Sequence, residues 1–205
     1  MKRILAAAFL IVGMTASSVR AADVIEEWAA IKPAAPALKP VTVDQKTTAL
    51  LMLDFMKQNC GQRPRCVASL PAMKKLLDSA RAAKATVIYS IIANSKIEDV
   101  LSEVAAHDGE PSVLSGPDKF RNTDLEKILK DKGIQTVIAV GTAANGAVLY
   151  TASGAAFRGM KVIVPVDGMS ATDPVAEYAT VLNLLSAPTV SAATTLTRSD
   201  MVKFQ

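Results

Sequence analysis

Runs of apolar residues alternate with segments of helical spacing along most of this chain. Five runs are rich in apolar or β-branched residues and have the length of strands buried in a sheet: Ala49–Leu53, Thr86–Ile92, Thr136–Val140, Lys161–Val166 and Val190–Leu196. Apolar residues recur at helical spacing in four further segments: Val67–Ala83, Thr123–Lys132, Asn145–Phe157 and Val175–Leu185. Because strands and helices alternate, we predict an α/β fold, a three-layer doubly wound sandwich with a mainly parallel sheet.

The chain before the first strand has a different character. Asp23–Ile31 is compatible with a short helix that carries Trp28. Three prolines then keep the chain extended, since proline cannot continue a helix: Pro33, Pro36 and Pro40. We therefore expect an N-terminal Ala/Pro-rich arm over residues 22–46, followed by a single domain over residues 47–205.

The first 21 residues have the organisation of a secretory signal peptide. Lys2 and Arg3 precede a short apolar run, Ile4–Val12, and Val19–Ala21 is a usable cleavage site. The apolar run is shorter than the ~18 residues that a membrane span requires. We therefore expect cleavage after Ala21, a periplasmic or secreted location, and no stable membrane insertion.

Cleavage also changes the charge. The whole chain carries a formal charge of +4, and the signal contains three basic residues and no acidic one, so the remainder carries +1. The three basic residues are Lys2, Arg3 and Arg20. The basic balance is thus mostly a property of the signal, and we expect no nucleic-acid partner.

An oxidising compartment would allow the two cysteines, Cys60 and Cys66, to pair. They enclose a turn-forming loop, Gly61–Arg65, so a disulfide would pin a local segment. The alternative is two inert or unpaired thiols.

Asp54 is the first candidate for chemistry. It ends a strand that otherwise carries no polar group, so the sheet would present its carboxylate at the carboxyl edge, where open α/β sheets place their ligands. Burial raises the pKa of a carboxyl and a nearby lysine lowers it, which allows tuning for acid or base work. The alternative role is a cap of a helix or turn.

The second candidate is the turn Gly141–Ala147, which follows another strand and opens a helix. Backbone N–H groups at a helix start can bind an anion or a polarised oxygen. Asn145 has two possible roles, orienting a substrate or capping the helix. A third turn, Asp167–Ala171, is expected to make polar contacts near the cleft without a catalytic role.

Several kinds of site are disfavoured. His107 is the only histidine and lies in a polar loop, which argues against a Ser-His-Asp triad and a histidine-built zinc site. No Gly-x-Gly-x-x-Gly follows the first strand, so a dinucleotide site would lack its usual cradle. We therefore expect no metal and no cofactor.

Four ordered segments together resemble the isochorismatase-like (cysteine hydrolase) superfamily. They are the strand ending at Asp54, Phe120–Leu125, Asn145–Ala152 and the turn at Asp167. The resemblance covers roughly residues 47–200 and implies the family's Rossmann-like fold, a small-molecule substrate and a homo-oligomer. The single histidine departs from the nicotinamidase branch, which binds a metal through an aspartate and two histidines.

The family's nucleophile motif is Thr-Asn-x-Cys-Val-x-x-Thr-Ala. Here Ala144 replaces the threonine, and Ala147 stands at the nucleophile-equivalent position of the cysteine. A methyl group cannot attack a carbonyl. The resemblance makes Ala144, Asn145 and Gly146 the oxyanion-binding and substrate-binding residues.

The resemblance also indicates a catalytic lysine. The Phe-x-x-Thr-Asp-Leu pattern that starts at Phe120 matches the family segment after this lysine, which usually stands several residues before the phenylalanine. Lys119 lies directly before Phe120. Either the loop is shortened and Lys119 reaches the site, or the lysine is lost and Lys119 is a solvated residue paired with Asp118.

Three hypotheses about function follow. The first is a hydrolase without a cysteine nucleophile, in which Asp54 is the acid and base and Lys119 holds charge. The second is a small-molecule-binding pseudoenzyme that keeps the cleft and has lost turnover. The third moves thiol chemistry to Cys60 or Cys66, which lie shortly after Asp54.

Overall fold

The computed structural model describes residues 21–205, so the expected signal peptide lies, up to residue 20, outside the described residues. The chain separates into two units, one ending at Pro36 and one spanning Ala37–Gln205. In the first unit, Trp28–Ala30 forms a single 3-10 turn instead of the helix expected over Asp23–Ile31, because short isolated helices are marginal. In residues 21–205, no helix is long and apolar enough to cross a membrane.

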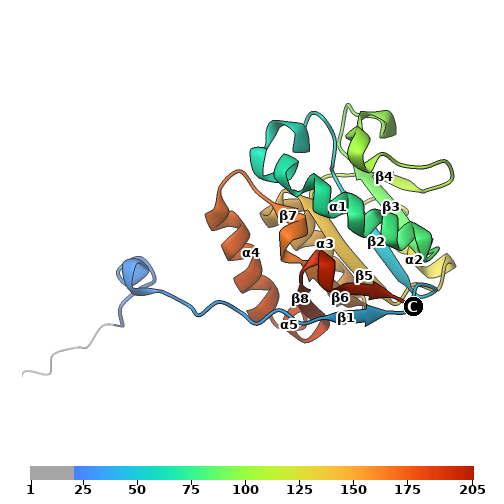
Figure 1. The fold of residues 1–205 in the computed structure, drawn as a ribbon. Helices are drawn as coiled ribbons and strands as arrows, with labels where there is room; N and C mark the ends of the chain where they lie inside the picture. Colours follow the sequence, from blue (N-terminus) through green and yellow to red (C-terminus); the bar gives the residue numbers. More distant parts are fainter. Residues whose placement is uncertain (1–20) are drawn as a thin grey trace, which may run out of the picture. The chain divides into compact units, whose positions relative to one another are not determined.

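The second unit is built around a parallel sheet (Figure 1). Six of its strands follow the order β4-β3-β2-β5-β6-β8, and the two-residue β7 also pairs with β5. A separate parallel pair joins β1 to β9. The bounds are β1 Val41–Val43, β2 Thr48–Leu53, β3 Thr86–Ile91, β4 Ser112–Leu114, β5 Thr136–Thr142, β6 Lys161–Pro165, β7 Met169–Ser170, β8 Thr194–Thr197 and β9 Val202–Phe204.

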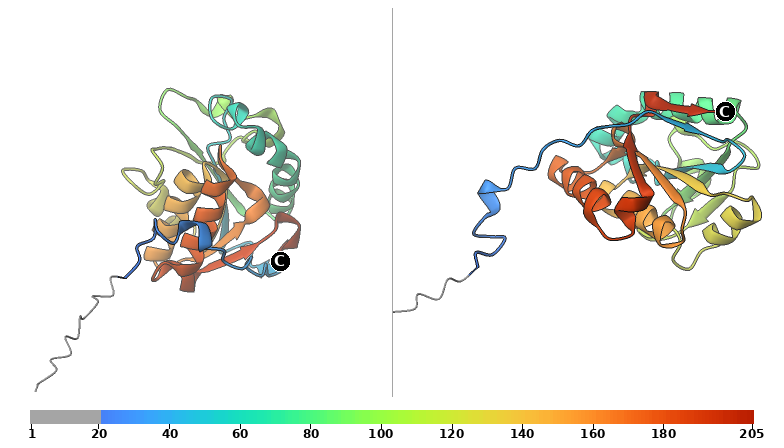
Figure 2. Two further views of the ribbon diagram at one scale, coloured as in Figure 1. Left: turned by 90° about the vertical axis from the view of Figure 1, so that its left-hand side faces the viewer. Right: turned by 90° about the horizontal axis from the view of Figure 1, so that it is seen from below.

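Helices cover both faces of this sheet (Figure 2). Their bounds are α1 Pro64–Ala82, α2 Leu125–Asp131, α3 Leu149–Phe157, α4 Pro174–Ser186 and α5 Val190–Ala193. The central strand β2 alternates between two cores: Leu50 and Met52 face the cluster containing α1, whereas Leu51 and Leu53 face the cluster containing α2, α3 and α4. The predicted doubly wound α/β sandwich is confirmed.

The strand order reverses between β2 and β5. From β2 the chain builds outward through β3 and β4, and from β5 it builds the other way through β6 and β8. In open α/β sheets, ligands bind at this switch point, at the carboxyl ends of the strands. The switch point here lies between the ends of β2 and β5, at Asp54 and Ala143.

The predicted last strand, Val190–Leu196, is wrong in its first half. Val190–Ala193 forms the short helix α5, and only Thr194–Thr197 pairs with β6. Alanine favours helix and β-branched threonine favours strand, so the change of composition explains where the helix ends.

The compact unit also begins before residue 47, where the domain was expected to start. Val41 in β1 lies opposite Val202 in β9, and Gln45 N–H donates to the carbonyl of Gln205. This strand pairing draws the end of the expected arm into the fold, so the compact unit starts at Ala37.

Candidate active site

Asp54 lies at the carboxyl end of β2, between β3 and β5. The chain turns sharply there, with φ of 58° at Asp54, a conformation that aspartate tolerates better than most residues. Leu53 is paired with Ser90 of β3, which brings the Ser90 hydroxyl next to the carboxylate. Ser90 Oγ donates a hydrogen bond of 2.6 Å to Asp54 Oδ1. The sheet register therefore fixes the carboxylate from one side.

Lys119 meets this carboxylate from the loop between β4 and α2. Its Nζ lies 2.8 Å from Asp54 Oδ1 and 2.7 Å from Oδ2, and it also donates to the carbonyl of Gly116 at 2.9 Å. An ammonium has three N–H donors, so all three are occupied. The sequence left two alternatives open for Lys119; in the structure it is buried against Asp54 and is not a solvated loop residue.

The lysine side chain is completely buried, with 0% exposure, and Asp54 is 4% exposed. Burial lowers the pKa of Lys119 below the ordinary value of 10.5, although the Asp54 carboxylate acts in the opposite direction. An ammonium without a partner would be costly at this depth. The ammonium and the carboxylate therefore neutralise each other's charge away from solvent.

Packing against α3 places the lysine loop. Phe120 lies so close to Gly154 that a Cβ at position 154 would stand 2.9 Å from the phenyl ring. The guanidinium of Arg158 lies over the same ring, 4.2 Å from its centroid. Lys119 N–H donates to Thr151 Oγ1 at 3.4 Å. The small residue at 154 lets the loop approach the helix, which brings the side chain of Lys119, the residue before Phe120, to the end of β2.

The turn after β5 forms the other wall. A Cβ at Gly141 would lie 2.0 Å from the Leu53 carbonyl oxygen, and φ there is 140°, so glycine is required where β5 runs against β2. The peptide bond between Thr142 and Ala143 is cis. The Ala143 carbonyl accepts the N–H of Gly146 at 3.0 Å. A π-helical turn, Ala144–Val148, leads from there into α3.

The expected oxyanion residues occupy this turn. Ala144 and Ala147 are buried, whereas Asn145 is exposed. Asn59 was not anticipated from the sequence: its Nδ2 donates to the Thr142 carbonyl at 3.4 Å and ties the loop after β2 to the turn. Ser90 was missed as well, although it is a buried polar residue near the carboxyl end of β3.

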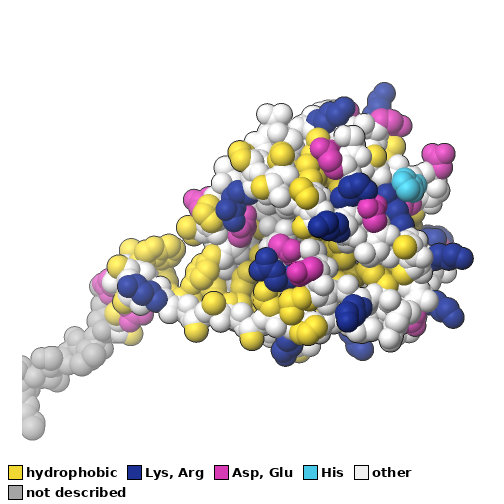
Figure 3. Space-filling view, in the orientation of Figure 1, with side chains coloured by type: hydrophobic (Ala, Val, Ile, Leu, Met, Phe, Trp, Pro, Cys, Tyr) yellow, Lys and Arg dark blue, Asp and Glu magenta, His cyan; other side chains and the backbone are white. Residues whose placement is uncertain are grey.

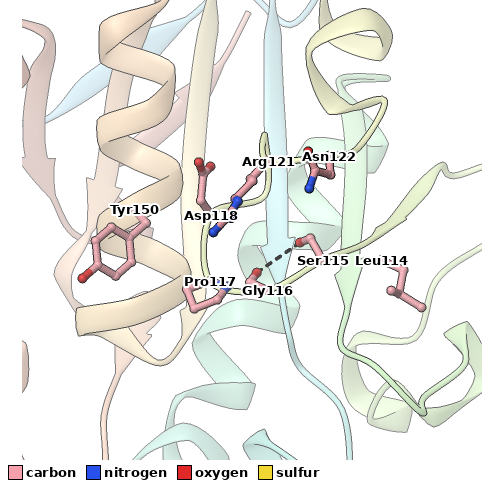
Figure 4. Close-up of a pocket in the computed structure, with 8 residues that line it drawn as sticks. All are labelled: Leu114, Ser115, Gly116, Pro117, Asp118, Arg121, Asn122 and Tyr150. Carbon is pink, nitrogen blue, oxygen red and sulfur yellow. Dashed lines mark hydrogen bonds between the residues drawn. The ribbon is translucent and has the colours of Figure 1, made fainter.

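A cavity of about 480 Å³ lies between the loop around Lys119 and Tyr150 of α3; Figure 4 shows its lining residues. Its lining residues are Leu114, Ser115, Gly116, Pro117, Asp118, Arg121, Asn122 and Tyr150. Asp54 is not among them, but Gly116 is shared, since its carbonyl accepts both Ser115 Oγ at 3.1 Å and Lys119 Nζ. The cavity therefore adjoins Lys119 rather than containing the carboxylate.

The other polar residues considered from the sequence lie outside this site or have structural roles. Asp167 accepts the backbone N–H and the hydroxyl of Ser199, at 2.8 and 2.6 Å, and so ties the end of β6 to the loop before β9. His107 is exposed in the loop that precedes β4. Within residues 21–205, no group of three or more histidine, cysteine, aspartate or glutamate residues is arranged to hold a metal ion.

Cys60 and Cys66 form a disulfide, and both are fully buried. The bond joins the 3-10 turn Cys60–Gln62 to the first turn of α1. Neither sulfur is a free thiol, so the structure gives no support to thiol chemistry at these positions.

Comparison with known proteins identifies the family of this chain. Residues 48–197 match the isochorismatase domain. A curated relative, the secreted isochorismatase effector Isc1 of Verticillium dahliae, is 28% identical over 148 residues, which cover 65% of this chain and 78% of the relative.

Solved structures share the fold. A cysteine hydrolase from Pseudomonas syringae pv. phaseolicola superposes with a TM-score of 0.69 at 20% identity, covering 82% of this chain and 95% of that one. N-carbamoylsarcosine amidase from Thermoplasma acidophilum superposes with a TM-score of 0.64 at 23% identity, covering 75% and 97%. Since the family match spans most of the chain, this protein belongs to the isochorismatase family of hydrolases.

Proposed function

We propose that this protein is an exported hydrolase of a small molecule that uses Asp54 as its general acid and base and needs no cysteine nucleophile. The observation that carries the proposal is the buried contact of the Lys119 ammonium with both carboxylate oxygens of Asp54. Burying two charges is expensive, and such groups in a cleft are candidates for function. The pair lies at the switch point of the sheet, where this fold class binds ligands.

Asp54 acts first as a base. It takes a proton from a water molecule while the water oxygen bonds to the electrophilic carbon of the substrate. The bond from that carbon to the leaving oxygen or nitrogen then breaks, and Asp54 returns the proton to the leaving group. One water is consumed per turnover. General acid–base catalysis of this kind contributes about 10²–10⁴-fold.

The turn after β5 binds the substrate oxygen that becomes negative. The N–H groups of Gly146 and Val148 already donate to the Ala143 carbonyl, so we assign the oxyanion role to the N–H groups of Ala144 and Asn145. Donors at a helix start are suited to this role because they need no reorganisation. Ala147 supplies no nucleophile, and its small side chain leaves room for the attacking water.

Lys119 positions the base. Its ammonium contacts both oxygens of Asp54. It also compensates the negative charge that develops in the transition state. The adjoining cavity at Gly116 and Tyr150 supports binding of a small molecule next to the pair. Export is supported by the signal-like sequence of residues 1–21 and by the similarity to Isc1 of Verticillium dahliae, a secreted effector.

The test is hydrolysis of a panel of small amides, esters and enol ethers by the chain from residue 22. We expect turnover that Asp54→Asn lowers by about 10²–10⁴-fold, while thiol alkylation leaves it unchanged. Asp44→Asn is the matched control, because Asp44 is an exposed carboxylate outside the site. Turnover that survives Asp54→Asn contradicts the proposed role.

The second candidate is a small-molecule-binding protein without turnover. It is favoured by the methyl group of Ala147 and by the 4% exposure of Asp54, which leaves little access to the carboxylate. It predicts a ligand-dependent rise in the melting temperature with no hydrolysis at any pH. Turnover that depends on Asp54 excludes it.

A further inference from the structure

The two oxygens of the Asp54 carboxylate are not equally occupied. A carboxylate has about four lone-pair sites, two on each oxygen. Oδ1 accepts the Ser90 hydroxyl at 2.6 Å and Lys119 Nζ at 2.8 Å, so both of its sites are taken. Oδ2 accepts only Lys119 Nζ, at 2.7 Å. Since no further donor in residues 21–205 is hydrogen-bonded to this carboxylate, the protein leaves one site open, and it is on Oδ2.

The protein rather than bulk solvent sets this asymmetry. Asp54 and Lys119 are the only buried charged side chains in residues 21–205. Lysine, arginine, aspartate and glutamate side chains are otherwise spread over the surface on the face that Figure 3 shows. Ser90 is 1% exposed, so solvent does not compete with its hydroxyl for Oδ1. The hydrogen bonds around the carboxylate therefore decide which oxygen can take a proton.

Ser90 is bonded to Asp54 twice. The Asp54 backbone N–H donates to the Ser90 carbonyl at 3.3 Å, and Ser90 Oγ donates in return to the carboxylate. Both contacts follow from the register that pairs Leu53 of β2 with Ser90 of β3. The backbone and the carboxylate of Asp54 are thus held by the same residue. Rotation of the carboxylate is restricted, and the oxygen turned away from Ser90 stays the open one.

We infer that Ser90 is a positioning residue, which occupies Oδ1 and so makes Oδ2 the oxygen of Asp54 that carries the proton in the reaction. The inference rests on the proposed function of Asp54. The attacking water gives a proton to the open lone pair of Oδ2 while its oxygen bonds to the electrophilic carbon. The new O–H bond then breaks as the proton passes to the leaving group, and the carboxylate regains its charge. Ser90 itself exchanges no proton with the substrate.

The loss of the Ser90 hydroxyl should change the proton chemistry of Asp54 in two ways. Ser90→Ala opens a site on Oδ1, where a proton would point at the protein instead of the substrate. It also removes a donor that favours the charged carboxylate, so the carboxyl should take up its proton at higher pH. A hydrogen bond to a charged group is strong enough for a shift of about one to two pH units.

Steady-state kinetics on a substrate from the hydrolysis panel form the first test. We expect Ser90→Ala to lower kcat by about tenfold and to leave KM unchanged, because Ser90 does not contact the substrate. The acidic limb of its pH–rate profile should move to higher pH. Ser90→Thr keeps a hydroxyl and should restore both. The control is Ser95→Ala, which removes a buried hydroxyl that donates to the Ile92 carbonyl and does not contact Asp54.

A second measurement does not need turnover. The chain from residue 22 is labelled with ¹³C at the aspartate carboxyl carbons, and the Asp54 signal is identified by its loss in Asp54→Asn. Its chemical shift is then followed against pH, with circular dichroism as the check on folding. We expect the carboxyl to titrate at higher pH in Ser90→Ala, and at the wild-type position in Ser90→Thr and Ser95→Ala.

The two measurements separate failure of this inference from failure of the proposed function. Turnover that Asp54→Asn abolishes and Ser90→Ala leaves unchanged, with an Asp54 signal that responds to pH as in the wild type, overturns the inference alone. A folded Ser90→Thr that behaves like Ser90→Ala in both measurements also overturns it, since packing rather than the hydroxyl then matters. A shifted Asp54 signal in Ser90→Ala without turnover in the wild type contradicts the hydrolase and supports the hold of Ser90 on the carboxylate.

Discussion

Lys119 Nζ lies 2.7 Å from Oδ2 and 2.8 Å from Oδ1 of Asp54, although the two residues are separated by 65 positions in the sequence. The third donor of the ammonium is taken by the Gly116 carbonyl. No hydrogen-bonding capacity of the ammonium is left over, and water has no access to it. Removing either charge therefore leaves the other buried without a partner.

We expect Lys119→Met to lower the free energy of unfolding by about 3–5 kcal/mol, because it leaves the Asp54 carboxylate buried and uncompensated. The double variant Asp54→Asn with Lys119→Met should recover much of this loss. Urea unfolding followed by circular dichroism measures both. Lys127→Met is the control, since Lys127 forms an exposed pair with Asp131 that is worth about 1 kcal/mol or less. Equal effects at the two lysines would contradict the interpretation.

The pKa of Lys119 predicts how activity responds to alkaline pH. Burial lowers this pKa below 10.5, so the ammonium loses its proton before an ordinary lysine does, and turnover should fall at a pH below 10.5. Between the lowered pKa of Lys119 in the folded chain and its ordinary value of 10.5 in the unfolded chain, the unfolded chain binds more protons than the folded one. The contribution of Lys119 to the free energy of unfolding therefore rises with pH in this range. A pH–rate profile measured beside unfolding curves separates the two effects. Activity that falls only together with unfolding would refute the assignment.

Ala147→Cys should create a thiol nucleophile. The position is buried at the start of a helical segment, where a thiolate is stabilised, and Asp54 and Lys119 are already in place. We expect a new amide-hydrolysing activity that iodoacetamide abolishes, with an acyl adduct on residue 147 detectable by mass spectrometry. Ala147→Ser is the matched variant with a weaker nucleophile. A folded Ala147→Cys protein that never acylates would show that the turn does not correspond to the family's nucleophile turn.

Gly141→Ala should lower the free energy of unfolding by at least about 3 kcal/mol. A Cβ there would lie 2.0 Å from the Leu53 carbonyl, and the backbone has φ of 140°. Gly146→Ala in the same turn is the control: its Cβ would have ordinary contact with Ala143 at 3.8 Å, so we expect a change within about 1 kcal/mol. Thermal unfolding of the two variants measures the difference. Similar stability of both would contradict the close approach of β5 to β2.

Replacing the disulfide by Cys60→Ala with Cys66→Ala should lower the free energy of unfolding by about 2 kcal/mol, the chain-entropy value for such a short loop; the two cysteines are six residues apart. The hydrolysis rate of the folded double variant should stay unchanged, because neither sulfur belongs to the proposed mechanism. Initial rates and unfolding curves of the same preparations provide the measurement. Loss of turnover in folded protein would revive the thiol hypothesis.

The strands near the centre of the sheet could be predicted, because a strand buried on both faces leaves an unbroken apolar run. Thr48–Leu53 and Thr136–Thr142 were found within one or two residues of their ends. The edge elements were harder. β4 and β9 have three residues each and β7 has two, too short for a periodic pattern, and they form because a neighbouring strand offers its free hydrogen-bonding groups.

Ser90 and Asn59 show why part of the site could not be predicted. A serine in a strand has no sequence signature for its partner; the register that pairs it with Leu53 brings it to Asp54. Asn59 reaches the Thr142 carbonyl across 83 positions. Such contacts depend on the three-dimensional paths of two loops rather than on local spacing.

The sequence by itself determined the layers of the fold and the polar group that each central strand presents at its end, since strand and helix periods are local properties. It also determined that residue 147 carries a methyl group and no nucleophile. Only the tertiary structure decided that Lys119 contacts Asp54. That contact depends on Phe120 packing against Gly154, a long-range fit of side-chain shape that sets where the loop turns and how far the ammonium reaches.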